Sequence, residues 1–198
     1  MGIEFDVIEG QTPLDEDERD GLLIPAVSTR GELDEFEQHN IENAIAWTLS
    51  RSFRLENVFT EAFVKEVHIR MFGDIWSWAG EFRKSNKNLG IDKWNIGAEL
   101  KQLNEDALFW VKNKIYRSDE LAIRYKHRLV SIHCFPNGNG RHSRLMADIV
   151  IEKILKEPVF TWGMAGANLV LDIRQEYIKA IKAADKGNYK PLISFARS

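Results

Sequence analysis

The residues best suited to chemistry lie in one short stretch, positions 133–144, which reads HCFPNGNGRHSR. Gly138 and Gly140 flank an asparagine, and such a turn can direct its N–H groups toward a bound anion. Apolar residues at helical spacing follow, so a helix begins at the turn, and its N-terminus attracts negative charge. Arg141 and Arg144 are three positions apart and project from one face of that helix, where they could clamp two phosphates. The stretch predicts a polyphosphate site.

His133 stands just before this turn. An imidazole with its ordinary pKa of about 6.5 can accept a proton from an incoming hydroxyl at neutral pH. Asn139 and the backbone amides of the turn would line an anion hole beside it. Each part also has a plain structural explanation, as a capping histidine, an ordinary glycine turn or solvated arginines. Because all of those explanations would have to hold together, the combination favours a catalytic site.

The composition bounds the class of protein. The 198 residues are 44% apolar with a formal net charge of −3, which is enough material for one sizeable core and favours a single domain. Basic residues are scattered among acidic ones, so we expect no nucleic-acid partner. The single cysteine, Cys134, excludes an internal disulfide framework and a cysteine-based zinc site. No apolar run approaches the roughly 20 residues of a membrane span, and no signal peptide is recognisable, so we expect a cytoplasmic protein without a membrane partner.

Helical periodicity dominates the chain after an acidic N-terminal arm at residues 1–27. Thr29 and Glu32 have the spacing of a capping box. The sequence predicts helices over about 32–49, 59–71, 98–115, 118–132, 139–155 and 168–184, with a short last one at Pro191. Polar residues and a glycine interrupt the apolar ones between Phe82 and Ile96, which predicts a short β-hairpin. Residues 28–198 are therefore expected to form one all-α domain with one hairpin.

The pattern HxFxxGNGRxxR at 133–144 resembles the signature of the Fic (Fic/Doc) family. The similarity extends from about Ile41 to the C-terminus and includes WAGEFR at 78–83 and GNYKPL at 187–192. Within the family the chain is most similar to the group called mobile mystery protein B, through TRGEL at 29–33 and EQHNI at 37–41. The resemblance implies a helical Fic-like domain with a hairpin flap.

The resemblance also implies an activity, the transfer of a nucleoside monophosphate, usually AMP from ATP, onto a Tyr, Ser or Thr hydroxyl of a protein substrate. It assigns His133 as the general base, Gly138, Asn139 and Gly140 as the anion hole, Arg141 to the remaining phosphates and Arg144 to the terminal one. These roles suit the chemistry, because phosphoryl-type transfer depends on positioning and on charge stabilisation at nonbridging oxygens.

The segment 82–96 would be a flap that aligns a target segment by main-chain pairing. Its residues include Arg83, Lys84, Ser85, Asn86 and Lys87. Tyr177, on the helix expected at 168–184, could stack on an adenine, although aromatic residues of such helices usually belong to the core.

Asn137 departs from the family pattern, which usually has Asp or Glu there to hold Mg²⁺. An amide oxygen can ligate magnesium but brings no negative charge, and Mg²⁺ prefers carboxylates together with substrate phosphates. Magnesium is therefore expected as a cofactor only with weakened affinity. Either the nucleotide supplies most of the ligands, or the protein uses metal poorly, transfers another group, or has lost robust activity.

Many relatives also carry a Ser/Thr-x-x-x-Glu-Gly/Asn segment whose glutamate pairs with the second motif arginine. Ser28 and Glu32 are a partial match, since Leu33 stands where Gly or Asn is expected. Glu32 also fits the capping box, so it is a candidate for either role. The C-terminus offers no substitute segment, which leaves room for a separate inhibitory, antitoxin-like protein.

Two other functions remain open. The same fold could act as a phosphotransferase or phosphocholine transferase if the diphosphate compound binds in another orientation. It could also be a catalytically weak regulatory module that binds a nucleotide through its arginines and docks a partner. His133 beside Asn139 and the two arginines favours the enzyme, and Asn137 favours the module.

Overall fold

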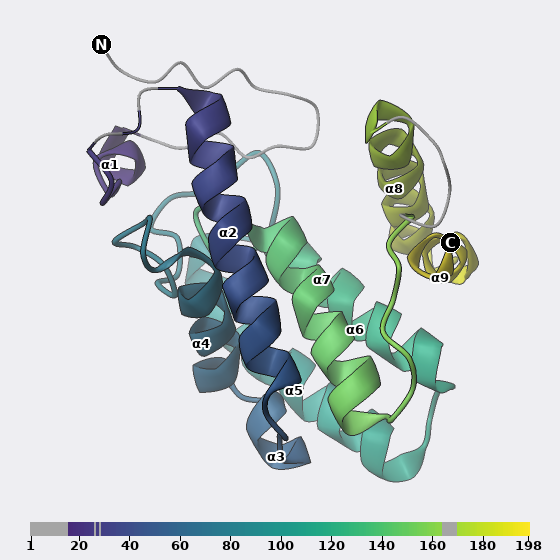
Figure 1. The fold of residues 1–198 in the computed structure, drawn as a ribbon. Coiled ribbons are helices and arrows are strands. Elements are labelled where there is room, and N and C mark those ends of the chain that lie inside the picture. Colours follow the sequence, from purple (N-terminus) through teal and green to yellow (C-terminus); the bar gives the residue numbers. More distant parts are fainter. Residues whose placement is uncertain (1–15, 26, 28, 164–169) are drawn as a thin grey trace.

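The computed structural model describes residues 16–25, 27, 29–163 and 170–198, and this part of the chain is helical (Figure 1). The predicted all-α class is confirmed. In chain order the elements are α1 (Glu16–Arg19), α2 (Arg30–Leu49), α3 (Leu55–Val58), α4 (Glu61–Phe72), the 3₁₀ turn η1 (Lys93–Asn95), α5 (Ile96–Asn113), α6 (Ser118–Ile132), α7 (Asn139–Ile149), the π-helical turn η2 (Val150–Ile154), α8 (Val170–Asp185) and α9 (Lys190–Arg197).

Helix α2 begins with the predicted capping box. The Oγ1 of Thr29 accepts a hydrogen bond from the Glu32 amide at 3.2 Å, and the Glu32 carboxylate accepts one from the Thr29 amide at 3.0 Å. The Thr29 amide at the N-cap and the Glu32 amide in the first turn have no intrahelical carbonyl to bond, so they would otherwise lack partners. The cap fixes the start of a long helix that packs along α4 (Figure 1).

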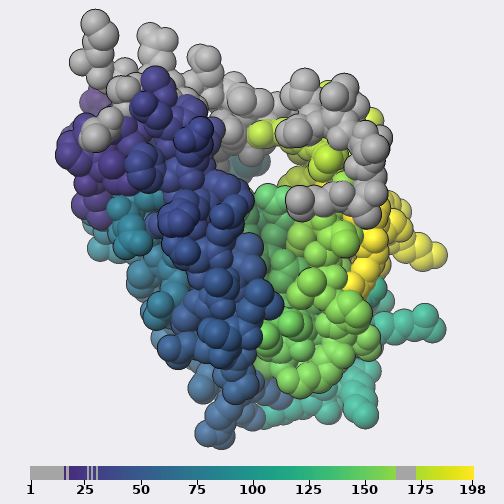
Figure 2. All heavy atoms as spheres, viewed as in Figure 1, coloured from purple at the N-terminus to yellow at the C-terminus, as the bar shows by residue number. Residues whose placement is uncertain are grey.

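Helix α7 lies between α2 and α8, and its deeper side packs on α6 and α4 (Figure 1). Its residues Met146, Ala147 and Ile149 are fully buried, so the helix predicted from residue 139 lies inside the core. The atoms of α2 and α7 adjoin on the face shown in Figure 2. The guanidinium of Arg141, on α7, donates to the carboxylate of Glu37, on α2. The N-terminus of α7 is therefore positioned by helices from both halves of the chain.

The segment predicted as a hairpin, residues 82–96, contains no strand. It is an irregular loop that ends in the turn η1, and Asp92 caps this turn by accepting a hydrogen bond from the Trp94 amide at 2.9 Å. The side chain of Asn86 ties the two limbs together, since its Oδ1 accepts from the Lys93 amide at 2.8 Å. Side-chain hydrogen bonds thus hold the two limbs together, in place of the main-chain hydrogen bonds of a hairpin. We refer to residues 82–96 as the flap loop.

The described part of the N-terminal arm lies against the root of the flap loop. Leu22 forms an isolated antiparallel bridge with Trp76, and the indole of Trp78 donates to the Glu18 carbonyl at 2.8 Å. Residues 1–15, 26 and 28 lie outside the described chain, so most of the predicted arm stays a prediction. No helix within the described ranges is both long enough and apolar enough to cross a membrane.

Candidate active site

His133 is the residue at which α6 ends, and its backbone is left-handed with φ 58°. This conformation turns the chain into the motif loop, residues 133–138, and places the imidazole in the interior, where the residue is only 6% exposed. Burial and the nearby Arg83 guanidinium lower its pKa to about 4, and the ring also hydrogen-bonds to the backbone of Val130. The imidazole is therefore neutral at pH 7, which is the form a general base needs.

Asn139 fastens the motif loop from within. Its Oδ1 accepts a hydrogen bond from the Phe135 amide at 2.9 Å, and its Nδ2 donates to the Phe135 carbonyl at 2.7 Å. The Phe135 ring is fully buried, so it anchors the motif loop in the core. Because both polar atoms of Asn139 serve the loop, anion binding at this turn would fall mainly to backbone amides.

Gly138 precedes α7 in a left-handed conformation, φ 76°, and a Cβ there would lie 2.5 Å from the Phe72 ring. Glycine is therefore required at this position for both space and backbone geometry. No side chain among the described residues caps the first turn of α7, so its N-terminal amides form the anion-attracting end that the sequence predicts. The Gly138 amide is occupied, since it donates to Asn137 Oδ1 at 2.6 Å.

Arg141 faces α2 and α4. Its Nη1 donates to the Glu37 carboxylate at 2.6 Å, and its guanidinium lies 5.0 Å from the centroid of the Phe72 ring. Glu37 is 3% exposed, and its other oxygen accepts a hydrogen bond from the Trp76 indole at 2.8 Å. A buried carboxylate on a motif arginine was not predicted. The signal was present, however, because Glu37 lies four residues from both Leu33 and Ile41 on the apolar face of α2.

Arg144 faces α8 instead. Its guanidinium lies 5.8 Å from the centroid of the Tyr177 ring, and burial is the main cause that lowers its pKa. The fully buried Lys126 of α6 hydrogen-bonds to the Tyr177 hydroxyl. Tyr177 is thus beside a motif arginine, where its predicted contact with an adenine stays a prediction. Arg141 and Arg144 therefore have different neighbours, although they lie close enough for the charge of Arg141 to lower the pKa of Arg144.

The flap loop is tied to the motif loop by the buried side chain of Arg83. Its Nε donates to the His133 carbonyl at 2.7 Å, its Nη1 donates to the Ser85 carbonyl at 2.8 Å, and its Nη2 donates to the Ile91 carbonyl. The two loops also touch directly, since a Cβ on Gly90 would lie 2.6 Å from the His133 Cβ. The predicted flap therefore lies directly over the predicted base.

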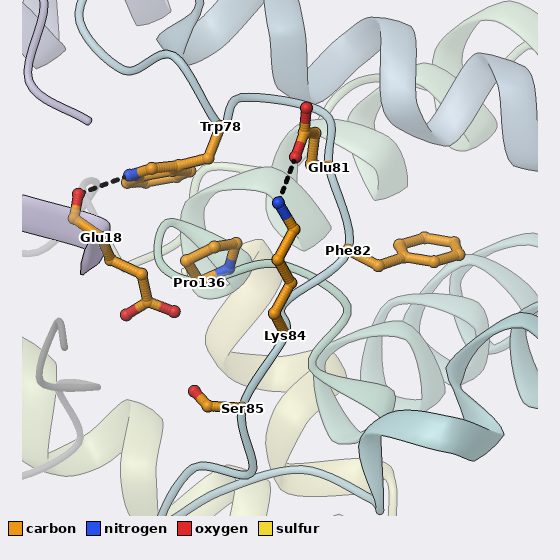
Figure 3. A pocket seen from close by; sticks show the side chains of 7 residues that line it. All are labelled: Glu18, Trp78, Glu81, Phe82, Lys84, Ser85 and Pro136. Atoms are coloured by element: carbon orange, nitrogen blue, oxygen red, sulfur yellow. Dashed lines mark hydrogen bonds and ion pairs between the residues drawn. The ribbon is translucent and has the colours of Figure 1, made fainter. Parts of the chain in front are cut away.

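Two lysines of the flap loop differ in their surroundings. The side chain of Lys84 is 88% exposed, and its ammonium lies 3.3 Å from the Glu81 carboxylate. The side chain of Lys87 is 2% exposed, and its ammonium lies 2.5 Å from the Glu18 carboxylate. Figure 3 shows the pocket between these groups, where Glu18, Trp78 and Pro136 face Lys84 and Ser85. Its volume is about 290 Å³, and Glu81 and Phe82 complete the lining. Pro136 of the motif loop also lines the pocket, beside the segment that was predicted to align a target.

The residues predicted for inhibition and metal binding have other neighbours. Ser28 lies outside the described residues, and Glu32 serves as the cap of α2, so an inhibitory role for this pair stays a prediction. Within the described ranges, no three His, Cys, Asp or Glu side chains gather as metal ligands. The Oδ1 of Asn137 carries no charge and accepts from the Gly138 amide, so the turn fits a resident Mg²⁺ poorly.

Cys134 has a structural position. It is 1% exposed, and burial raises the pKa of its thiol to about 12. A thiol held protonated at neutral pH is a poor nucleophile. Cys134 therefore fills the core and is no candidate nucleophile.

Comparisons with known proteins agree with this geometry. Residues 58–151 match the model of the Fic/DOC family. A curated relative, "Protein adenylyltransferase Fic" of Aedes aegypti, is 26% identical over 136 residues, which cover 67% of this chain and 26% of the relative. The chain thus spans about a quarter of the length of this curated relative.

Solved structures share the fold at lower identity. The BepC protein of Bartonella tribocorum, with bound AMPPNP, matches with a TM-score of 0.64 and 18% identity over 92% of this chain and 97% of its own. The N-terminal Fic domain of a cell filamentation protein of Bartonella quintana, with bound ADP, matches with a TM-score of 0.58 and 17% identity over 87% of this chain and 86% of its own.

Proposed function

The chain belongs to the Fic/DOC family over residues 58–151, and on that premise we propose that it transfers AMP from ATP to a Tyr, Ser or Thr hydroxyl of a protein. The observation that carries the proposal is the placement of His133. Its imidazole is buried and neutral in the loop that leads into α7, and its backbone carbonyl accepts a hydrogen bond from Arg83 of the flap loop. Relatives named adenylyltransferases and neighbours with bound nucleotides support the same activity.

The proposed reaction assigns a task to each group. The unprotonated nitrogen of His133 takes the proton of the target hydroxyl, whose oxygen forms a bond to the α-phosphorus of ATP. The bond from that phosphorus to the bridging oxygen breaks, and pyrophosphate leaves. Amides at the start of α7, with Arg141 and Arg144, stabilise charge on the phosphate oxygens. A positioned base adds about 10²–10⁴ in rate, so the rest of the acceleration rests on this electrostatic environment.

The proposed reaction assigns magnesium a minor role, because this chain offers few ligands for it. Asn137 offers a neutral oxygen that is already bonded to the Gly138 amide, so the phosphates of ATP would have to supply most of the ligands. The two motif arginines would supply positive charge in any case, since both belong to α7 close to its N-terminus. The proposed steps therefore run through side chains and amides of this chain.

The pair between Glu37 and Arg141 favours a second candidate, a nucleotide-binding regulatory module with weak catalysis. A carboxylate at 2.6 Å already occupies one phosphate-binding arginine, and Asn137 weakens metal binding. A separate inhibitory protein would fit either candidate, because the described residues place Glu32 in a cap.

Incubation with ATP followed by mass spectrometry of the whole chain and of candidate targets tests the proposal. Adenylylated protein is expected from the wild type, and His133→Ala should bind ATP normally but add nothing. Addition of a phosphoryl group would instead support the phosphotransferase alternative. Binding of ATP without any modification would support the regulatory module.

A further inference from the structure

His68 lies inside the protein on α4, with no exposed surface and both ring nitrogens hydrogen-bonded. The amide of Gly80 donates to Nδ1 at 3.0 Å, and Nε2 lies 3.1 Å from the carbonyl oxygen of Asn137. An amide N–H can only donate and a carbonyl can only accept, so the hydrogen must sit on Nε2. One tautomer of this imidazole is therefore fixed by its two partners.

The ring is held just as firmly by packing. It stacks on the Phe135 ring with centroids 3.8 Å apart at 26°, and the ring of His142 meets it edge-on at 5.5 Å. Burial is the largest cause that lowers the pKa of His68 well below its ordinary value. The imidazole thus stays neutral and immobile beneath the motif loop. A side chain so constrained can hold a neighbouring backbone group in one orientation.

We propose that His68 is the positioning residue of the anion site, because it fixes the peptide that joins Asn137 to Gly138. In a planar trans peptide the C=O and the following N–H point in opposite directions. With the Asn137 carbonyl turned down toward His68, the Gly138 N–H must point up, away from the core. That N–H is now bonded to Asn137 Oδ1 at 2.6 Å. An oxygen of the transferred phosphate takes that place when the Asn137 side chain turns away.

The same imidazole links this peptide to the flap loop. Gly80, which donates to Nδ1, lies three residues before Arg83, whose guanidinium binds the His133 carbonyl and both limbs of the loop. A shift of His68 would therefore disturb the anion site and the root of the flap together. This inference rests on the proposed transfer of AMP, since it describes how the site stabilises the transferred phosphate.

Two variants separate the hydrogen bonds from the packing. His68→Phe keeps an aromatic ring on Phe135 and loses both bonds, whereas His68→Gln keeps a donor for the Asn137 carbonyl. His127→Phe is the matched control, because it also removes a buried histidine, one whose Nε2 bonds to the Asp185 carboxylate of α8 and not to the motif loop. ATP-binding stoichiometry measured by calorimetry normalises all rates to correctly folded sites.

The expected result is a split between kcat and KM. Loss of one oxyanion donor costs about 10²–10³ in kcat in other enzymes, so kcat of His68→Phe should fall by about that factor while the KM for ATP stays within about threefold. His68→Gln should recover most of the rate, and His127→Phe should remain within about threefold of the wild type. Equal losses in His68→Phe and His127→Phe would overturn the inference, because they would show a general effect on the core.

A binding readout keeps the test independent of the proposed activity. In ¹⁵N-labelled protein, the amide resonance of Gly138 should shift on addition of ATP in the wild type and in His68→Gln, but not in His68→Phe. The same shift in all three, or none in the wild type, would overturn the inference. If the wild type transfers nothing but its Gly138 resonance shifts as expected, the proposed function fails while the positioning role stands.

Discussion

Arg83 donates through Nε to the backbone carbonyl of His133 at 2.7 Å, so the flap loop and the candidate base share one guanidinium. The other nitrogens of that guanidinium donate to the Ser85 and Ile91 carbonyls on the two limbs of the loop. A planar group with several fixed donors can hold three carbonyls at once, whereas an ammonium on a flexible stem cannot hold them in the same geometry. The position of His133 is therefore coupled to the shape of the flap loop.

Arg83→Lys should reduce transfer by about 10–100-fold, since the loss of about 1.4 kcal/mol of positioning energy is a tenfold change in rate. ATP affinity should change by less than about threefold, because the phosphate-binding groups lie on α7. Rates with a protein target, together with calorimetric titration of ATP, check this outcome.

Arg70→Lys is the matched control for this substitution. Arg70 is a partly exposed arginine whose guanidinium pairs with Glu66 one turn away on α4. This ion pair does not involve the flap loop. Replacement of Arg70 should leave transfer unchanged. If Arg83→Lys weakens ATP binding as much as it slows transfer, Arg83 supports the nucleotide site and not the alignment of base and target.

Glu37→Gln should tighten ATP binding by about 3–10-fold. The carboxylate competes with phosphate oxygens for Arg141, and removal of a close opposite charge is typically worth about 1 kcal/mol when one partner is partly solvated. Glutamine keeps an oxygen that can accept from the Trp76 indole, so the local packing should survive. Titration calorimetry with ATP measures the change. Weaker binding in the variant would instead show that Glu37 holds Arg141 in its phosphate-binding position.

The fold was largely predictable because helical periodicity and caps are local signals. The capping box of Thr29 and Glu32, the helix that starts at Ser118, and the buried helix after the glycine turn all follow from residues within one or two turns. The conformation of the flap loop was not predictable from the sequence, because it depends on side-chain hydrogen bonds between residues far apart in the chain. Arg83 reaches backbone atoms at Ser85, Ile91 and His133, and no period in the sequence encodes that arrangement.

The candidate site, like the fold, was predictable from the sequence only in part. The motif itself placed His133, Gly138 and both arginines near one helix end, because consecutive residues must lie close together. Glu37 and His68 were missed, since they are separated in the chain from the motif by 104 and 69 residues at the contacts they make. Both carry polar groups on the apolar faces of their helices, and that pattern is a usable signal for a buried functional contact.

Asn137→Asp should raise the Mg²⁺ dependence of transfer. Its carboxylate could still accept the Gly138 N–H and would add the negative charge that Mg²⁺ favours. Initial rates over a magnesium titration, for the wild type and the variant at equal ATP, measure this change. An identical magnesium dependence in both proteins would show that the residue at position 137 does not contact the metal.

Acidification should destabilise the protein between pH 7 and pH 5. Burial lowers the pKa of His133 and of His142 to about 4, so the folded state binds fewer protons than the unfolded chain once the pH falls below about 6.5. Each such histidine removes on the order of 1.4 kcal/mol of unfolding free energy per pH unit in that window. Melting temperatures at the two pH values check the direction.

Asp148 acts in the opposite sense and provides a control for this titration. Burial raises its pKa to about 7, so the folded state holds this proton more tightly than the unfolded chain and gains stability as the pH falls. Asp148→Asn should therefore steepen the loss of stability on acidification, and His142→Phe should reduce it. A melting temperature that is equal or higher at pH 5 in the wild type would contradict the assignment of neutral buried histidines.

The most direct test of the central claim is a comparison of ATP labelled at the α-phosphate with ATP labelled at the γ-phosphate, using the wild type and His133→Ala side by side. The proposed function predicts label on protein only from the α-labelled nucleotide and only with the wild type, while both proteins bind ATP equally well. Label from the γ-position, or equal α-labelling by His133→Ala, would contradict it.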